Sequence, residues 1–134
     1  MDIEISLDNR MLNLEMIHNY LSQEAYWAEG RSLATVVKSI SNSVCYGMYH
    51  DGIQIGFGRV VTDYAVFGWI MDVFIVEEHR GKGLGKLMIH AIMNHPELDG
   101  ISRWGLTTKD AHGLYEQFGF VRVGDSATHM ELLR

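Results

Sequence analysis

The fold is decided by the stretch from Val73 to Met88, which reads VFIVEEHRGKGLGKLM. Its first four residues are apolar and mostly β-branched, so they predict a strand. A charged loop follows, then three glycines on alternate positions flanked by cations, and then apolar residues at helical spacing. Glycines let the backbone approach a ligand closely, and the first turn of a helix offers unpaired N–H groups with a partial positive charge. A strand, a glycine-rich turn and the N-terminus of a helix follow one another here. This order predicts a phosphate-binding loop.

Two common phosphate-binding loops are excluded by the residues present. A P-loop that ends at Lys86 would need glycine at Arg80 and a hydroxyl at Leu87. A dinucleotide-binding G-x-G-x-x-G motif would need its third glycine at Lys86 or at Met88. Neither motif is present.

The pattern that remains is R-x-x-G-x-G, formed by Arg80, Gly83 and Gly85. It resembles the acyl-CoA pyrophosphate loop of the GCN5-related N-acetyltransferase (GNAT) family. On these residues alone, an ordinary glycine-rich turn that caps a helix is the alternative, since short glycine motifs recur by chance.

A second stretch, Ala111 to Phe120, reads AHGLYEQFGF and resembles the A-x-x-L-Y-x-x-x-G-F segment of the same family. Leu114 and Phe118 have the spacing of helix core residues, and Gly119 suits a helix C-terminus. In the family, the tyrosine of this segment lies near the thioester sulfur. The resemblance therefore implies that Tyr115 is the general acid that protonates the departing CoA thiolate.

Composition limits the classes of protein that the chain can represent. Its 134 residues, 47% of them hydrophobic, suit a single domain spanning 1–134. No apolar run reaches transmembrane length and no signal peptide is recognisable, so we expect a cytoplasmic protein without a membrane partner. Cys45 is the only cysteine and the histidines lack ligand spacing, so no metal site is expected. The net charge of −6 argues against nucleic acid as a partner.

Hydrophobic periodicity predicts an alternation of strands and helices along the chain. Strands are expected at 3–7, 43–50, 53–61, 66–76, 101–108, 121–123 and 128–133, and helices at 14–21, 33–40, 84–92 and 110–118, with caps at Asn13 and Asp110. Periodicity alone supports one α+β or α/β domain. The resemblance implies the mixed α/β GNAT fold, with a mostly antiparallel twisted sheet of six to seven strands flanked by about four helices.

The segment from Tyr26 to Arg31 reads YWAEGR and joins the first two predicted helices. Exposed loop aromatics often mark a binding surface, but Tyr26 and Trp27 are also able to fold back over the first helix. In the GNAT family this segment helps to form the acceptor pocket. The resemblance thus favours Tyr26, Trp27 and Arg31 as acceptor-binding residues, with Glu29 as a weaker candidate.

The resemblance also implies how acetyl-CoA binds. The backbone of Val73, Phe74, Ile75 and Val76 would pair with the pantetheine arm as an added strand does. The expected pyrophosphate set is Arg80, Gly81, Lys82, Gly83, Leu84, Gly85 and Lys86. Thr108, where the family often has asparagine, His112 and Tyr115 complete the expected cofactor set.

The general base is less well marked. Asp72 is a carboxylate inside the apolar run before the glycine loop. A carboxylate buried without a partner holds a proton more readily, which suits a base, but a structural hydrogen bond is an equal alternative. Glu29 and His112 are the other candidates for this role.

The predicted reaction is direct transfer of an acetyl group from acetyl-CoA to a primary amine of a small molecule. An acyl-CoA-binding sensor and a protein or peptide N-terminal acetyltransferase are the alternatives. A nucleotide-dependent kinase is disfavoured by the failed P-loop match. The identity of the acceptor is open, and so is a homodimer, which is common in the family.

Overall fold

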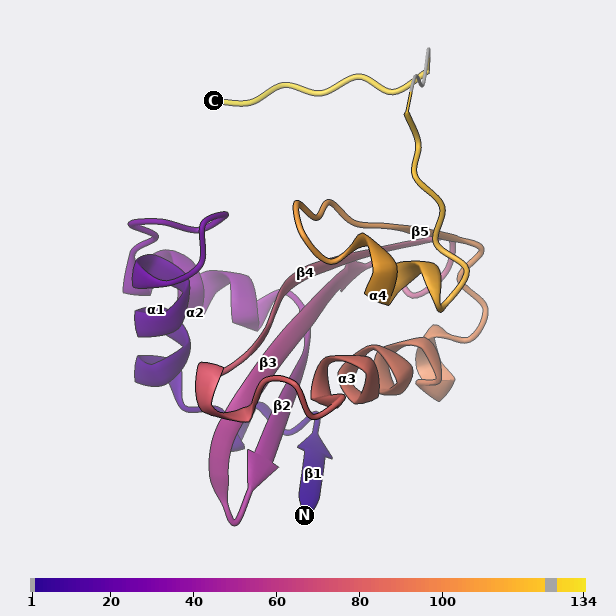
Figure 1. The fold of residues 1–134 in the computed structure, drawn as a ribbon. Coiled ribbons are helices and arrows are strands. Elements are labelled where there is room, and N and C mark those ends of the chain that lie inside the picture. The colour runs from indigo at the N-terminus through magenta and orange to yellow at the C-terminus, as the bar shows by residue number, and fades with distance from the viewer. Residues whose placement is uncertain (1, 125–127) are drawn as a thin grey trace.

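A computed structural model describes residues 2–124 and 128–134 (Figure 1). Within them the strands are β1 (Ile3–Ser6), β2 (Val44–His50), β3 (Ile53–Thr62), β4 (Phe67–Ile75) and β5 (Arg103–Gly105). The α-helices are α1 (Leu14–Gln23), α2 (Leu33–Ser41), α3 (Leu84–Met93) and α4 (His112–Glu116). Short 3₁₀ turns are η1 (Asn9–Met11), η2 (Glu77–His79) and η3 (Pro96–Leu98).

The five strands form one sheet in the order β1-β2-β3-β4-β5. The first four pair in antiparallel fashion, and β5 joins β4 in parallel. Helices cover both faces of the sheet. A core around Phe57 and Phe74 includes α1 and α2, whereas a second core around Met88 and Ile92 includes α3 and α4. This arrangement confirms the predicted fold class, with five strands in the described residues instead of six to seven.

Local sequence signals account for several boundaries. Asn13 and Ser32 cap α1 and α2, because each side chain accepts a hydrogen bond from a backbone N–H of the first turn. Asp51 and Gly52 both have positive φ, at 51° and 77°, which makes the tight turn between β2 and β3. Gly119, with φ of 91°, follows α4.

Strands β4 and β5 separate soon after they begin, and this divergence positions the site. They pair only from Phe67 to Trp69 on β4, whereas β3 pairs with β4 as far as Ile75. The edge of β4 from Ile70 to Ile75 that faces away from β3 therefore has no strand partner among the described residues. In Figure 1, β4 descends toward η2 while the chain after β5 leads into α4.

Two predictions for the last third of the chain are wrong. The expected helix from Asp110 begins at His112, and Asp110 does not cap it; Thr108 Oγ1 accepts a hydrogen bond from Ala111 N at 3.1 Å. The expected strands at 121–123 and 128–133 are not strands in the described residues. Their apolar alternation is present, but a strand also needs a neighbour, and the described chain supplies none.

The predicted strand at 101–108 is shorter than expected, because only Arg103–Gly105 pairs with β4. None of the helices in the described ranges is long and apolar enough to cross a membrane.

Candidate active site

A cleft of about 610 Å³ lies where β4 and β5 separate. Its walls are residues 69–73 of β4, residues 106–111 after β5, three residues of the α1–α2 loop, and Tyr115 and Leu133. The loop residues are Tyr26, Trp27 and Arg31. The fold thus places the three predicted acceptor residues in one cleft. Three further predicted site residues line the same cleft: Asp72, Thr108 and Tyr115.

A bulge in β4 lies in the wall of this cleft. Arg59 pairs with Met71 and Phe57 with Phe74, so Asp72 and Val73 together face Gly58 alone. Asp72 has φ of 55°, a left-handed conformation that is uncommon for any residue except glycine, although aspartate adopts it more often than most. Such backbone costs on the order of 1–3 kcal/mol and persists only where its surroundings hold it.

The Asp72 carboxylate is held by three donors. Arg59 Nε and Arg31 Nη1 each donate to Oδ2 at 2.7 Å, and the Trp27 indole N–H donates to Oδ1 at 2.8 Å. The Asp72 side chain is fully buried. Two guanidinium groups offset the desolvation of one carboxylate, and the three donors tie β3 and the α1–α2 loop to the bulge.

The α1–α2 loop also crosses to the other wall of the cleft. The Tyr26 hydroxyl accepts a hydrogen bond from Lys109 N at 2.9 Å, and Lys109 Nζ lies 5.4 Å from the centre of the Tyr26 ring. Tyr26 and Trp27 contact each other edge to face at 5.1 Å. These aromatics neither fold back over α1 nor project freely; instead they bridge the cleft from Asp72 to Lys109.

Tyr115 lies on α4 and is 8% exposed. Burial raises the pKa of its hydroxyl to about 12, and the nearby Tyr26 adds a smaller effect in the same direction. The phenol therefore keeps its proton at neutral pH and is able to donate it to a group in the cleft.

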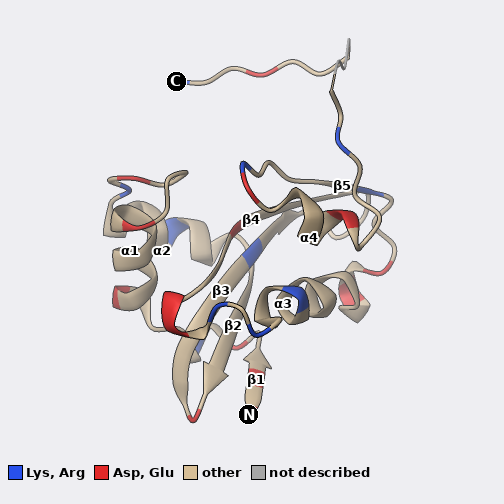
Figure 2. Cartoon of the chain, viewed as in Figure 1, with Lys and Arg blue, Asp and Glu red and all other residues tan. Residues whose placement is uncertain are grey.

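The glycine loop leaves the first turn of α3 without a side-chain cap. Gly81 and Gly83 have φ of 78° and 76°, and Gly83 is the N-cap of α3 without a side-chain hydrogen bond to the first turn. The N–H groups of that turn are left for a ligand. Figure 2 shows cations on this loop and at the start of α3.

Arg80 is partly engaged within the protein. Its Nε donates to the Ile75 carbonyl at 3.0 Å, and its Nη2 donates to the Tyr20 hydroxyl. The Tyr20 ring stacks on Phe74 at 3.9 Å. Arg80 thereby fixes the glycine loop to the end of β4, and its contact with a phosphate stays a prediction.

Two candidates for the general base lie elsewhere. His112 lines a neighbouring cavity of about 760 Å³, which shares Tyr115 with the cleft. Glu29 is exposed and does not line the cleft. Within the described lining, Asp72 and Asp110 are the acidic residues of the cleft.

Sequence reasoning missed Arg59, Trp69 and Lys109. Arg59 was detectable as a lone cation within the apolar strand 53–61, because a buried charge requires a partner. Trp69 lines the cleft from β4 and fills the space above Gly105, where an added Cβ would lie 2.4 Å from the ring. Lys109 contributes through its backbone N–H, for which no sequence signal exists.

A family model described as an acetyltransferase (GNAT) domain matches residues 41–122, more than half of the chain. The chain belongs to the GNAT acetyltransferase family. This GNAT protein is accordingly an acetyl-CoA-dependent N-acetyltransferase.

Relatives of the GNAT chain agree in fold along its whole length. A crystal structure of a protein assigned to the same family from Xanthomonas campestris is 42% identical, covers 100% of this chain and 94% of that one, and has a TM-score of 0.96. The spermine/spermidine N(1)-acetyltransferase of Bacillus subtilis is 29% identical over 88% of this chain and 85% of its own. A Clostridium acetobutylicum structure with acetyl-CoA shares the fold, with a TM-score of 0.70 and 14% identity over 98% of this chain and 95% of that one.

Replacing Asp72 by asparagine should lower the free energy of unfolding by about 3–5 kcal/mol, because Arg59 and Arg31 would be left near the core without their counter-charge. Chemical denaturation measures this change. Asp51→Asn is the matched control: Asp51 is also an aspartate with positive φ, but it is exposed in a turn, so we expect a change within about 0.5 kcal/mol. A loss of less than 1 kcal/mol for Asp72→Asn would contradict the anchoring role.

Proposed function

We propose that the protein transfers the acetyl group of acetyl-CoA directly to a primary amine of a small molecule. The observation that carries this proposal is that one cleft holds a protonated Tyr115, the unpaired edge of β4 and the anchored α1–α2 loop. In this proposal Tyr115 is the proton donor, the edge of β4 supplies backbone donors, and the α1–α2 loop is the wall that binds the acceptor.

The residues present fit acetyl-CoA. The free edge of β4 offers backbone groups to a ligand with amide bonds, and the bare N-terminus of α3 offers N–H groups to its pyrophosphate. An added Cβ at Gly81 or Gly83 would meet nothing within 4 Å, so the space beside the loop is open. Acetyl-CoA supplies the activated acyl group and a thiolate leaving group.

The chain itself supplies positioning and protons. A backbone N–H of the β4 edge near Val73 would stabilise negative charge on the acyl oxygen as the amine nitrogen bonds to the carbonyl carbon. Tyr115 gives its proton to the sulfur as the C–S bond breaks. The extra proton on the nitrogen then passes to water at the mouth of the cleft, and Tyr115 regains a proton from solvent.

Asp72 acts in this scheme as a positioning residue. All three of its hydrogen bonds are with groups of the protein, and two of the donors come from acceptor-binding residues, Trp27 and Arg31. A carboxylate suits the role of general base when it is buried without a partner, and Asp72 has three partners. The base role makes a distinct prediction, which is loss of the acid limb of the kcat/KM profile in Asp72→Asn.

The size of the acceptor is limited by the bridge between Tyr26 and Lys109. This bridge joins the two walls of the cleft through a hydrogen bond and a cation–π contact. A folded protein terminus would have to displace it, whereas a small molecule fits a cleft of about 610 Å³. The bridge therefore favours a small acceptor over a protein N-terminus.

The charge of the cleft favours an acceptor that carries an anionic group beside its amine. Arg31 and the buried Arg59 face one carboxylate, Asp72, so this cluster keeps one positive charge. The other charged residues of the lining, Lys109 and Asp110, offset each other. Arg31 lines the cleft and uses one terminal nitrogen for Asp72. Its remaining N–H groups suit a carboxylate, and aromatic walls at Trp27 and Trp69 suit an apolar body.

Tyr115→Phe should lower kcat by about 10–1000-fold, because the general acid is lost while the ring is kept. Release of free thiol from acetyl-CoA over a panel of amines measures the rate. Tyr64→Phe, an exposed tyrosine on the β3–β4 loop, is the control and should keep full activity. Full activity in Tyr115→Phe would remove it as the acid, and absence of turnover with every amine in the wild type would favour a sensor.

An amine with a carboxylate should be acetylated with a kcat/KM at least about tenfold above that of a polyamine such as spermidine, because a second ammonium group would be repelled by the cluster. Arg31→Gln should abolish this preference. Arg103→Gln, which removes an exposed arginine outside the cleft, should retain it. A preference for the polyamine, the substrate class named for the Bacillus subtilis relative, would overturn this assignment.

A further inference from the structure

Tyr20 of α1 reaches across to the side of the protein where acetyl-CoA is expected to bind. Its ring stacks on Phe74 of β4, with 3.9 Å between the ring centres and 8° between the planes. Its hydroxyl accepts a hydrogen bond from Nη2 of Arg80, the residue that begins the glycine loop. Tyr20 is buried in the core that α1 forms with β4. It therefore contacts both the strand and the loop of the expected cofactor site, although it belongs to neither.

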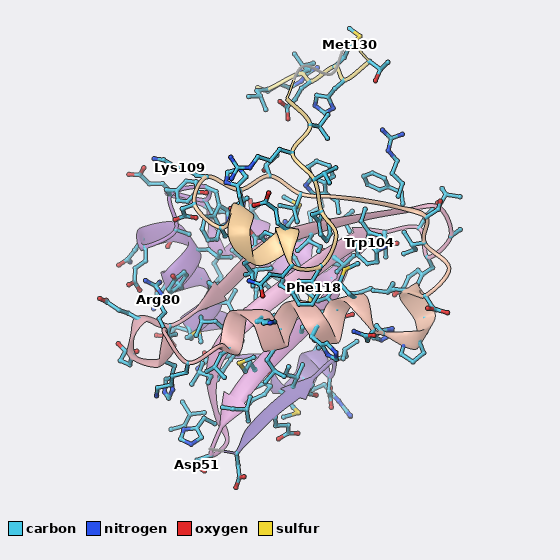
Figure 3. All side chains as sticks on the ribbon, turned by 45° about the vertical axis from the view of Figure 1, so that its right-hand side comes forward. Asp51, Arg80, Trp104, Lys109, Phe118 and Met130 are labelled. Atoms are coloured by element: carbon cyan, nitrogen blue, oxygen red, sulfur yellow. The ribbon has the colours of Figure 1, made fainter. Side chains whose placement is uncertain are left out.

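Arg80 lies where the free edge of β4 meets the glycine loop. Val76 N donates to Ile55 O on β3 at 2.9 Å, so the carbonyl of Ile75, one residue earlier, points to the opposite edge. Arg80 Nε donates to that carbonyl at 3.0 Å. Figure 3 labels Arg80 on the side of the molecule where the chain before α3 lies near α1, away from Trp104. A ligand that pairs with β4 and places its pyrophosphate on the first turn of α3 has to pass this point.

The two hydrogen bonds of Arg80 fix its guanidinium group before a ligand arrives. A long side chain that is ordered only on binding costs conformational entropy at that moment, and Arg80 is otherwise exposed. Burial raises the pKa of the Tyr20 hydroxyl, whose usual value is already well above 7, so the hydroxyl carries no charge at neutral pH. A neutral phenol orients the arginine and leaves its positive charge for a phosphate, whereas a carboxylate in the same place would neutralise it.

We propose that Tyr20 is a positioning residue for acetyl-CoA, whose hydroxyl orients Arg80 toward the pyrophosphate while its ring packs on Phe74. Helix α1 thereby fixes the junction between β4 and the glycine loop. The proposal rests on the binding of acetyl-CoA at that loop and adds to it a residue from a distant part of the chain. Tyr20 acts through Arg80 and touches none of the reacting atoms. Its effect therefore falls on cofactor affinity and not on the chemical step.

Isothermal titration calorimetry of the protein with CoA tests the proposal without turnover. Tyr20→Phe keeps the ring and its stack on Phe74 and removes only the hydroxyl. The Kd for CoA should rise about tenfold, the effect of losing one hydrogen bond to a charged group. Tyr46→Phe is the matched control, because Tyr46 is fully buried and its hydroxyl makes no hydrogen bond within the described chain. This control should leave the Kd unchanged.

A double-mutant cycle shows whether Tyr20 acts through Arg80. Arg80→Met keeps a long side chain but has no hydrogen-bond donor. In that background, adding Tyr20→Phe should change the Kd for CoA by less than about twofold, since the partner of the hydroxyl is already gone. Steady-state rates give a second readout: in Tyr20→Phe alone the KM for acetyl-CoA should rise with the Kd, while kcat at saturating acetyl-CoA should stay within about twofold of the wild type.

Three results would overturn the positioning role of Tyr20. The first is an unchanged Kd for CoA in Tyr20→Phe, with the wild type binding normally. The second is an equal rise in Kd in the Arg80→Met background, because the hydroxyl would then act through the fold and not through Arg80. The third is a rise of the same size in Tyr46→Phe. Failure of the wild type to bind CoA at all would overturn this role together with the cofactor binding on which it rests.

Discussion

The buried carboxylate of Asp72 is the interaction on which the candidate site depends. It lies at a bulge in β4, in a left-handed conformation that the strand would not adopt without support. Its three donors come from β3 and from the loop between α1 and α2. One side chain therefore holds the bulge in the strand and fixes the loop whose residues Tyr26, Trp27 and Arg31 line the cleft. Removing the Asp72 side chain would destabilise both the bulge and the loop. A lower reaction rate in an Asp72 variant therefore reports on the structure of the cleft as well as on catalysis.

The divergence of β4 and β5 gives this anchored bulge its chemical setting. Parallel pairing with β5 is limited to the first three residues of β4, Phe67 to Trp69, so the rest of this edge of β4 has no strand partner in the described chain. Tyr115 reaches the same space from α4, and burial raises the pKa of its phenol further above neutral pH. The backbone supplies most of the polar groups expected to contact acetyl-CoA, whereas side chains on the acceptor side set the charge.

Local patterns were enough to predict most of the fold. The cap at Asn13 acts over four residues, and the structure confirms it. The helix predicted from residue 33 and the break between the strands at 43–50 and 53–61 are found where the local pattern places them. The strands expected at 121–123 and 128–133 failed because pairing depends on a neighbour that the pattern of a single segment does not contain. For the site, the sequence indicated Tyr26, Trp27, Arg31 and Asp72 separately. It did not indicate that Asp72 would bind two of the others, because that contact joins residues 41 and 45 positions apart.

Asp72 holds the loop between α1 and α2 in the free protein, and the Trp27 indole N–H reports on this contact directly. Hydrogen exchange of that N–H is measurable by NMR without any ligand. The hydrogen bond of 2.8 Å to a buried carboxylate predicts slow exchange, even though the Trp27 side chain is 40% exposed. In Asp72→Asn the same signal should exchange much faster. Exchange in the wild type as fast as that of a freely exposed tryptophan would contradict the account.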